Sequence, residues 1–504
     1  MASTSARTHA SRPSLNDLST ELIVLFCEWL RDAHYPSLLT LRRLSRRFNS
    51  IATPIAYRTL PVSRALADPA ADRTFPSAFR HISLYTNHVI VHGQLPPDGV
   101  RRILARVPKL LSVEWRYDEL EADSQRHYSL SGVLDLEQAR AIGTSVSIHG
   151  LPLRDFTKRQ ADAYLNSVPA SCLASLTLAI PAPSLTARLG SLRRLLVQST
   201  NLETFRYDDR GQGTSFMFEH GEKLPAFKDL TLKCYDWVHS TEDVKAHWNF
   251  SRLQTLRLLS VPTFNFFRSV AFPDFSGLHT LQVDDYSAHH VDRRVDATKG
   301  MYVLVKEHIR ALRVLDIVCY IEHFPLDAIA RHRNSLQVLR IRDHVGFGDE
   351  NKRCPTIDAY DLAQLAKYMV QVHTLEVDMD IEMCNPLDFI RAIAHFRNLS
   401  DVTIRVQTLL DAYGTDQSRV DKDFEAAMHI FQLLIRNRAP GRPWKRITVN
   451  VGDWQRNMVR RLSTSWRERN EAGVFAERCF VIERNQRERY TIREEGTEQV
   501  LGEL

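Results

Sequence analysis

Cysteine is scarce in this sequence, and no two cysteines form a C-x-x-C pair. Seven occur among 504 residues, scattered from Cys27 to Cys479. A disulfide framework or a structural zinc site normally needs clustered cysteines, so the sequence argues against both and favours a reducing compartment. We expect no metal ion and no cofactor.

Long hydrophobic runs are also missing. No apolar stretch reaches the roughly 20 residues that span a bilayer. The opening segment MASTSARTHASRPS lacks the apolar stretch of a secretory signal. We therefore expect an intracellular protein, in the cytoplasm, the nucleus or both, with no membrane partner.

An excess of one charge is absent too. The 66 basic and 60 acidic residues leave a net charge of +6, which is small for this length. One alternative is a nucleic-acid-associated protein that uses an arginine-rich C-terminal segment, but glutamates interrupt this segment and favour a solvated surface. The arginines are Arg456, Arg460, Arg461, Arg467 and Arg469. The sequence as a whole argues against a nucleic-acid partner.

The sequence contains no recognisable catalytic motif. It has no G-x-S-x-G elbow, no Walker loop and no H-E-x-x-H pair, and the stretch GFGDEN lacks the third glycine of a dinucleotide fingerprint. Several aspartates follow expected strands and could hold a cation or a basic peptide, although solvated turn residues are the simpler explanation. They are Asp208, Asp209, Asp284, Asp285, Asp378 and Asp380, with His289 and His290 as a further metal alternative. We expect no enzyme.

The N-terminal stretch LSTELIVLFCEWL has the pattern of an amphipathic helix. Leu22, Phe26 and Leu30 recur every four residues, and Ser19 is a favourable start. The pattern breaks at Pro36, and a second periodic run ends at Thr53-Pro54. Its apolar residues are Leu38, Leu41, Leu44, Phe48 and Ile51. A unit of this size is marginal alone, so we expect it to need a partner.

These residues together resemble an F-box motif. The resemblance covers residues 14–60, through LSTEL and then YPSLLTLRRLSRRFNSIATPIAYRTL up to Leu60. It departs at Ser19, where the family usually has proline, and at Leu44, where valine is commoner. The alternative is a pair of helices that caps the domain that follows.

The resemblance implies binding to the Skp adaptor of cullin-based ubiquitin ligases through the apolar helical face. On this interpretation, Cys27 and Trp29 face the chain's own second domain. The residues expected to divide between the motif's own core and the adaptor interface are Leu18, Leu22, Ile23, Phe26, Leu38, Leu41 and Leu44.

The rest of the chain repeats an L-x-x-L-x-L pattern, which is typical of leucine-rich repeats. The copies are uneven and mostly lack the family's asparagine. They begin at Leu173, Leu202, Phe227, Leu253, Leu278, Leu312, Leu336, Val372, Leu399 and Trp444, with weaker candidates at Phe79 and Leu110. Helix-like stretches separate them at 185–197, 301–312, 326–333, 357–370, 386–396 and 424–436.

Strands that alternate with helices predict an α/β fold. We expect a small N-terminal helical F-box followed by an irregular leucine-rich-repeat solenoid, with a concave parallel sheet and outer helices. The alternative is an α/β domain with helices on both faces. The predicted parts are a disordered tail (1–13), the F-box helices (14–60), the degenerate repeat solenoid (61–455), and a charged C-terminal cap and tail (456–504).

In such a solenoid, the residues between and just after the second and third apolar positions point into the concave face. Both charges alternate there, which suits a protein target better than nucleic acid; solvated strand residues are the simpler alternative. The candidate target-binding residues are Arg206, Asp208, Arg257, Asp284, Arg340, Arg342, Glu376 and Asp378.

Two functions fit these patterns. One is a substrate receptor of a Skp/cullin/F-box ubiquitin ligase, with the F-box on the adaptor and the repeats on an unknown protein target. The other is a leucine-rich-repeat scaffold that keeps an F-box-like cap outside any ligase.

Overall fold

The structure is a computed structural model. It describes residues 15–117, 130–151, 168–178, 189–208, 213–285, 291–343, 354–406, 422–438, 442–451, 478–485, 489–495 and 500–503. The expected tail (1–13), the Gly346 stretch, the His289-His290 pair and the arginine-rich segment lie outside these ranges. The chain divides into two compact units, 1–179 and 180–504. This division falls inside the predicted repeat region, and not at residue 60.

The first unit begins with three short helices, α1 (Thr20–Ala33), α2 (Tyr35–Leu41) and α3 (Arg46–Arg58). Serines cap two of them, because the Ser19 hydroxyl accepts a hydrogen bond from the Leu22 N–H and the Ser45 hydroxyl accepts one from the Phe48 N–H. Ser19 therefore has its predicted role.

The predicted helix end at Thr53-Pro54 is wrong. α3 runs through Pro54 to Arg58, because Ile55 and Ala56 are buried and hold the last turns against the neighbouring helices. Packing outweighs the hydrogen bond that proline cannot donate.

The remainder of the first unit alternates strands and helices. Its elements are β1 (Thr59–Pro61), α4 (Arg64–Ala67), α5 (Ala71–Thr74), α6 (Pro76–Tyr85), β2 (His88–His92), α7 (Pro97–Leu104), β3 (Ser112–Arg116), α8 (Leu136–Ile142), β4 (Ser145–Leu151) and β5 (Leu173–Leu178). Strands β1 to β5 pair in parallel, in chain order. The weak repeat candidate at Phe79 is wrong, since Phe79 and Ile82 lie on the buried side of α6.

The second unit continues the alternation with more regular spacing. Its helices are α10 (Leu189–Gln198), α11 (Thr241–His247), α12 (Thr263–Ser269), α13 (Val291–Val303), α14 (Asp327–Ala330), α15 (Ala359–Tyr368), α16 (Pro386–Ala394) and α17 (Lys422–Arg436). Its strands are β6 (Thr204–Asp208), β7 (Asp229–Lys233), β8 (Thr255–Val261), β9 (Thr280–Asp285), β10 (Val314–Cys319), β11 (Val338–Asp343), β12 (Thr374–Met379), β13 (Asp401–Val406), β14 (Arg446–Val451), β15 (Arg478–Arg484), β16 (Tyr490–Glu494) and β17 (Val500–Glu503).

The sheet of this unit is mostly parallel. Strands β6 to β14 pair in chain order, and β15 to β17 add an antiparallel edge. Residues at the second apolar position of the repeat pair in register, as Leu256 does with Leu230 and Leu281. The sequence pattern therefore predicted strands β6 to β14 of this sheet, and β15 to β17 lie where a charged cap and tail were expected.

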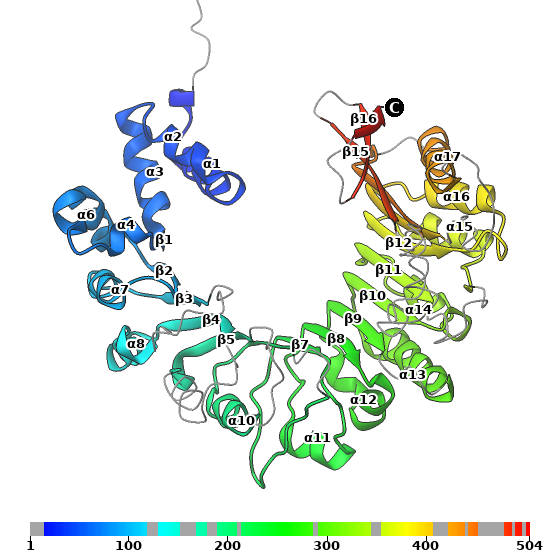
Figure 1. The fold of residues 1–504 in the computed structure, drawn as a ribbon, viewed down its shortest axis with the longest axis horizontal. Coiled ribbons are helices and arrows are strands. Elements are labelled where there is room, and N and C mark those ends of the chain that lie inside the picture. Colours follow the sequence, from blue (N-terminus) through cyan, green and yellow to red (C-terminus); the bar gives the residue numbers. More distant parts are fainter. Residues whose placement is uncertain are drawn as a thin grey trace, which may run out of the picture. The chain divides into compact units, whose positions relative to one another are not determined.

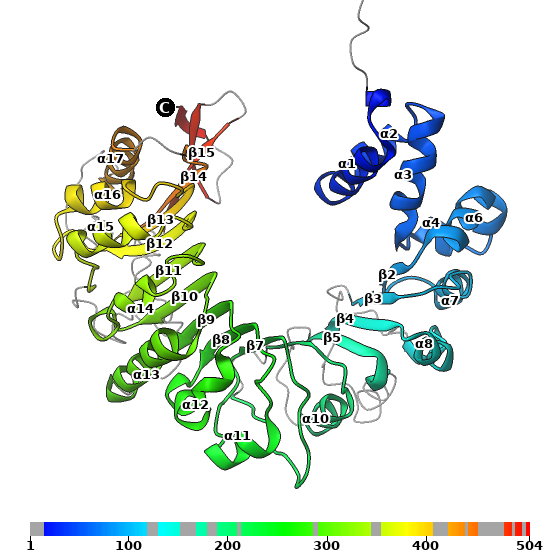
Figure 2. The same cartoon turned by 180° about the vertical axis from the view of Figure 1, so that it is seen from behind.

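Side chains of these strands alternate between a buried and a polar face. Leu, Ile and Val residues such as Leu256, Leu258 and Ile317 are buried. Within the described residues, the helices α11 to α17 of this unit lie on one side of the sheet in both views (Figures 1 and 2). We call the other side the polar face; it carries Arg206, Lys233 and Asp316, which alternate with the buried positions.

Candidate functional site

The three N-terminal helices enclose a small core. Cys27 and Phe48 are among its central residues, and Val24, Leu30 and Ile51 pack against it. The remaining core residues are Ile23, Leu38, Leu41, Ala52, Ile55 and Ala56. Ile23, Leu38 and Leu41 were expected to contribute to the core or to an adaptor interface. Their exposure of 5% or less assigns them to the core.

Two arginines of α3 form polar contacts with α1 and with a residue just before it. Arg47 at the start of α3 donates a hydrogen bond of 2.8 Å to the Leu18 carbonyl, just before α1. Arg58 at the end of α3 forms an ion pair of 3.0 Å with Glu28 on α1. The relative position of α1 and α3 is therefore held at both ends.

The opposite side of α1 is an exposed apolar surface. Leu18, Leu22, Leu25, Phe26 and Trp29 have exposed fractions from 37% to 63%. At about 100° per residue, Leu22, Leu25, Phe26 and Trp29 fall on one side of α1, away from Ile23 and Cys27, and Leu18 lies just before the helix. The Phe26 and Trp29 rings stack with centroids 6.3 Å apart. We call these five residues the apolar stripe.

Other apolar side chains of the same unit are exposed near the second helix. Leu44, in the turn after α2, is 61% exposed, and Tyr35 and Leu39 on α2 are each 38% exposed. Leu44 and the stripe residues Leu18, Leu22 and Phe26 are thus the predicted adaptor contacts that lie at the surface.

Sequence reasoning missed Leu25 and Trp29 and misplaced Cys27. The four-residue spacing of Leu22, Phe26 and Leu30 suggested one apolar face, yet Leu30 packs on the core. Cys27 is in the helical core, and Trp29 belongs to the exposed stripe. The sequence did contain a signal for this surface: Leu22, Leu25 and Trp29 follow Leu18 by four, seven and eleven residues, which is the spacing of one helical face.

The polar face of the second unit carries a network of ion pairs. Arg340 on β11 lies between Asp316 on β10 and Glu376 on β12, with N–O distances of 3.3 and 3.5 Å. Arg405 on β13 also contacts Glu376, at 2.6 Å. The strand register places Arg340 directly opposite both acids. Four neighbouring strands are thus joined by alternating charges.

A similar arrangement joins β6, β7 and β8. Arg206 and Arg257 both face the Asp229 carboxylate, at 3.5 and 3.7 Å. Lys233 contacts Asp208 at 2.9 Å. Asp208, expected to bind a target directly, therefore has a partner within the sheet.

Three of the expected target-binding residues are buried. Arg342 and Asp378 form an ion pair of 3.0 Å, and their side chains are 2% and 1% exposed. The Glu376 side chain is 10% exposed. These three residues were predicted to lie on an accessible binding surface, and this prediction is wrong. Arg342 on β11 and Asp378 on β12 pair with each other and are buried.

The aspartates that follow strands have mostly structural partners. Asp380 accepts hydrogen bonds from the backbone N–H groups of Cys354 and Glu382, and Asp284 is partly exposed. Burial raises the pKa of the Cys354 thiol above its ordinary value, and the nearby carboxylates of Asp378 and Asp343 raise it further. Among the described residues, no group of three His, Cys, Asp or Glu side chains is arranged to hold a metal ion.

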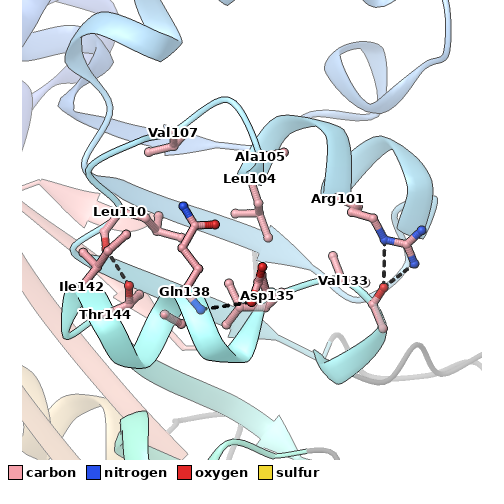
Figure 3. Close-up of a pocket in the computed structure, with 13 residues that line it drawn as sticks. Arg101, Leu104, Ala105, Val107, Leu110, Val133, Asp135, Gln138, Ile142 and Thr144 are labelled. Carbon is pink, nitrogen blue, oxygen red and sulfur yellow. Dashed lines mark hydrogen bonds between the residues drawn. The ribbon is translucent and has the colours of Figure 1, made fainter.

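A cavity of about 380 Å³ lies between α7 and α8 of the first unit (Figure 3). Its lining is mainly apolar, from residues such as Leu104, Leu110 and Val133. Arg101 at its edge donates two hydrogen bonds to the Gly132 carbonyl, and Asp135 caps α8 through the Gln138 N–H. These polar groups hold the local backbone, so the cavity offers chiefly apolar contact.

No family model and no curated protein matches this chain. None of the described helices is both long and apolar enough to cross a membrane.

Proposed function

We propose that this chain is a substrate-recognition subunit of a Skp/cullin/F-box ubiquitin ligase. The observation that carries the proposal is the apolar stripe, which leaves Leu22, Leu25 and Trp29 exposed on a helix whose other side is packed. Full burial of one such side chain contributes about 1.5 to 3 kcal/mol. Burial of the stripe under a partner would therefore contribute substantially to the free energy of binding. The resemblance of residues 14–60 to an F-box motif names that partner as the Skp adaptor.

The second unit supports the other half of the proposal. Its parallel strands recur with the L-x-x-L-x-L pattern and keep their helices on one side, as in a degenerate leucine-rich-repeat solenoid. Its polar face would hold a protein target. The chain would then contribute proximity and orientation, while the conjugating enzyme supplies the chemistry.

Co-purification with the Skp adaptor tests the proposal. Leu25→Asp introduces a charge at the centre of the apolar stripe and should abolish adaptor binding while leaving the melting temperature close to wild type. Leu84→Asp is the matched control, because Leu84 on α6 is also 62% exposed and lies outside the stripe. Equal adaptor binding by Leu25→Asp and Leu84→Asp would refute the assignment.

The runner-up is a repeat scaffold that acts outside a ligase. The same exposed stripe supports it, since another partner could cover that surface. A chain that retains protein partners but never co-purifies with the adaptor would favour the scaffold.

A further inference from the structure

We propose that the polar face of the second unit binds an acidic, carboxylate-rich segment of another protein. The inference rests on the proposed function, because it names the chemical class of the target. On this face, several basic side chains are more exposed than the acidic side chains that they contact.

Four basic side chains of this face lie further out than the carboxylates they contact, whereas Arg342 and Arg405 are about as buried as their partners. The side chains of Arg206, Lys233, Arg257 and Arg340 are 31% to 48% exposed, whereas the acids they contact are 10% to 22% exposed. The acids are Asp208, Asp229, Asp316 and Glu376. An approaching partner therefore meets basic groups first, although the charges pair within the face.

The exposed basic side chains can bind a carboxylate of a partner in addition to the one they already contact. A guanidinium carries five N–H donors in a planar fork. Arg206 faces Asp229 through Nη2, at 3.5 Å, and Arg257 faces the same carboxylate through Nη1, at 3.7 Å. These distances are longer than those of a tight ion pair, so a partner carboxylate can bind without first breaking a strong contact.

The spacing of the bases fits a short segment. They lie on β6, β7, β8 and β11, and adjacent strands are about 4.8 Å apart, which gives a span of roughly 24 Å. About seven extended residues cover that distance. In a protein segment of this length, acidic residues can occur only at the positions that lie opposite the basic groups.

Nucleic acid fits this surface less well. Strands β9 and β10 lie between Arg257 and Arg340, and they contribute Gln282, Asp284 and Asp316 to the same face. A phosphate backbone would bring negative charge past Asp284 and Asp316 at every nucleotide. The observations therefore favour a protein segment.

Fluorescence anisotropy with the full chain at low ionic strength tests the proposal. The probe is a labelled twelve-residue peptide of alternating Glu and Ser, and its uncharged counterpart replaces Glu with Gln. We expect the Glu peptide to bind at least tenfold more tightly than the Gln peptide. The combined variant Arg206→Gln, Lys233→Gln, Arg257→Gln, Arg340→Gln should lose this preference.

A matched variant controls for net charge. Arg194→Gln, Arg331→Gln, Arg333→Gln and Lys367→Gln remove the same charge from exposed positions on or beside helices α10, α14 and α15, and this variant should bind the Glu peptide as wild type does. Replacing two of the acids that the basic side chains contact, with Asp229→Asn and Asp316→Asn, should tighten binding severalfold.

Three results would overturn the inference. The first is equal affinity for the Glu and Gln peptides, and the second is an equal loss of Glu-peptide affinity in the control variant and in the variant of the polar face. The third is tighter binding of a twelve-nucleotide oligothymidine than of the Glu peptide. Peptide binding is measured without the adaptor. A chain that binds the peptide but fails to co-purify with the adaptor would refute the ligase and leave this inference standing.

Discussion

Arg342 on β11 and Asp378 on β12 form an ion pair that is closed off from solvent. Arg342 Nε lies 3.0 Å from Asp378 Oδ1, and the Asp343 N–H donates a hydrogen bond of 2.8 Å to the other carboxylate oxygen. Both charges were expected at an accessible surface. Their burial makes them a structural link between two strands.

Removing one member of this pair should destabilise the second unit strongly. Arg342→Ala leaves the Asp378 carboxylate buried without its guanidinium partner, which typically costs about 3 to 5 kcal/mol. Replacing both, as Arg342→Met with Asp378→Leu, should recover most of that loss. Urea unfolding measures both values, and Arg340→Ala should cost clearly less, because the Arg340 side chain is 40% exposed and Glu376 keeps its contact with Arg405. Equal losses for Arg342→Ala and Arg340→Ala would contradict the buried-pair account.

The N-terminal helices should not be stable as a fragment that ends near the limit of the F-box resemblance. The Tyr57 ring on α3 contacts the His81 ring on α6, and the Thr86 hydroxyl donates to the Tyr57 carbonyl at 2.8 Å. A fragment of residues 1–65 loses these contacts and the β1–β2 pairing, whereas a fragment of residues 1–117 keeps them. Circular dichroism melts should show a cooperative transition for the longer fragment only. A cooperative melt of the shorter fragment would show that the three-helix core suffices.

Charge reversal on the polar face should be costlier than an exposed position suggests. Arg206→Glu with Arg257→Glu places two acids beside Asp229 and should cost clearly more than the roughly 0.5 kcal/mol usual for each exposed substitution. The corresponding Gln variants should cost less. Adding Asp229→Asn to the reversed chain should restore part of the lost stability in urea unfolding; no recovery would mean that the three side chains are not coupled.

The second unit should lose stability as the pH falls, partly through His239. Burial lowers the pKa of His239 from 6.5 to about 4, and its ring nitrogen lies 2.7 Å from the Tyr235 hydroxyl. Between pH 6.5 and 4, the unfolded chain takes up a proton that the folded chain does not. Up to roughly 3 kcal/mol of unfolding free energy is therefore lost as pH falls through this range.

His239→Gln removes this titration and should flatten the dependence of unfolding free energy on pH. Other groups, such as His332, titrate in both proteins, so the difference between wild type and variant isolates His239. Parallel curves for the two proteins from pH 7.5 to 4.5 would contradict the assignment.

The sequence by itself determined strands β6 to β14 and which of their apolar residues face the core. The L-x-x-L-x-L pattern places apolar side chains at every second residue of a strand, and a register slip of one residue would turn them to the polar face. Ser19 likewise identified the start of α1, because a hydroxyl there satisfies an otherwise unpaired helical N–H. These are local properties of short segments.

Only the tertiary structure decided which apolar and charged residues remain exposed. Ile23 and Leu22 are equally apolar neighbours on α1, yet one is buried and the other exposed, because α2 and α3 cover a single side of the helix. Arg340 and Arg342 share one strand and face, yet only Arg342 is sealed from solvent. Burial depends on residues distant in the chain, which the spacing within one helix or strand does not specify.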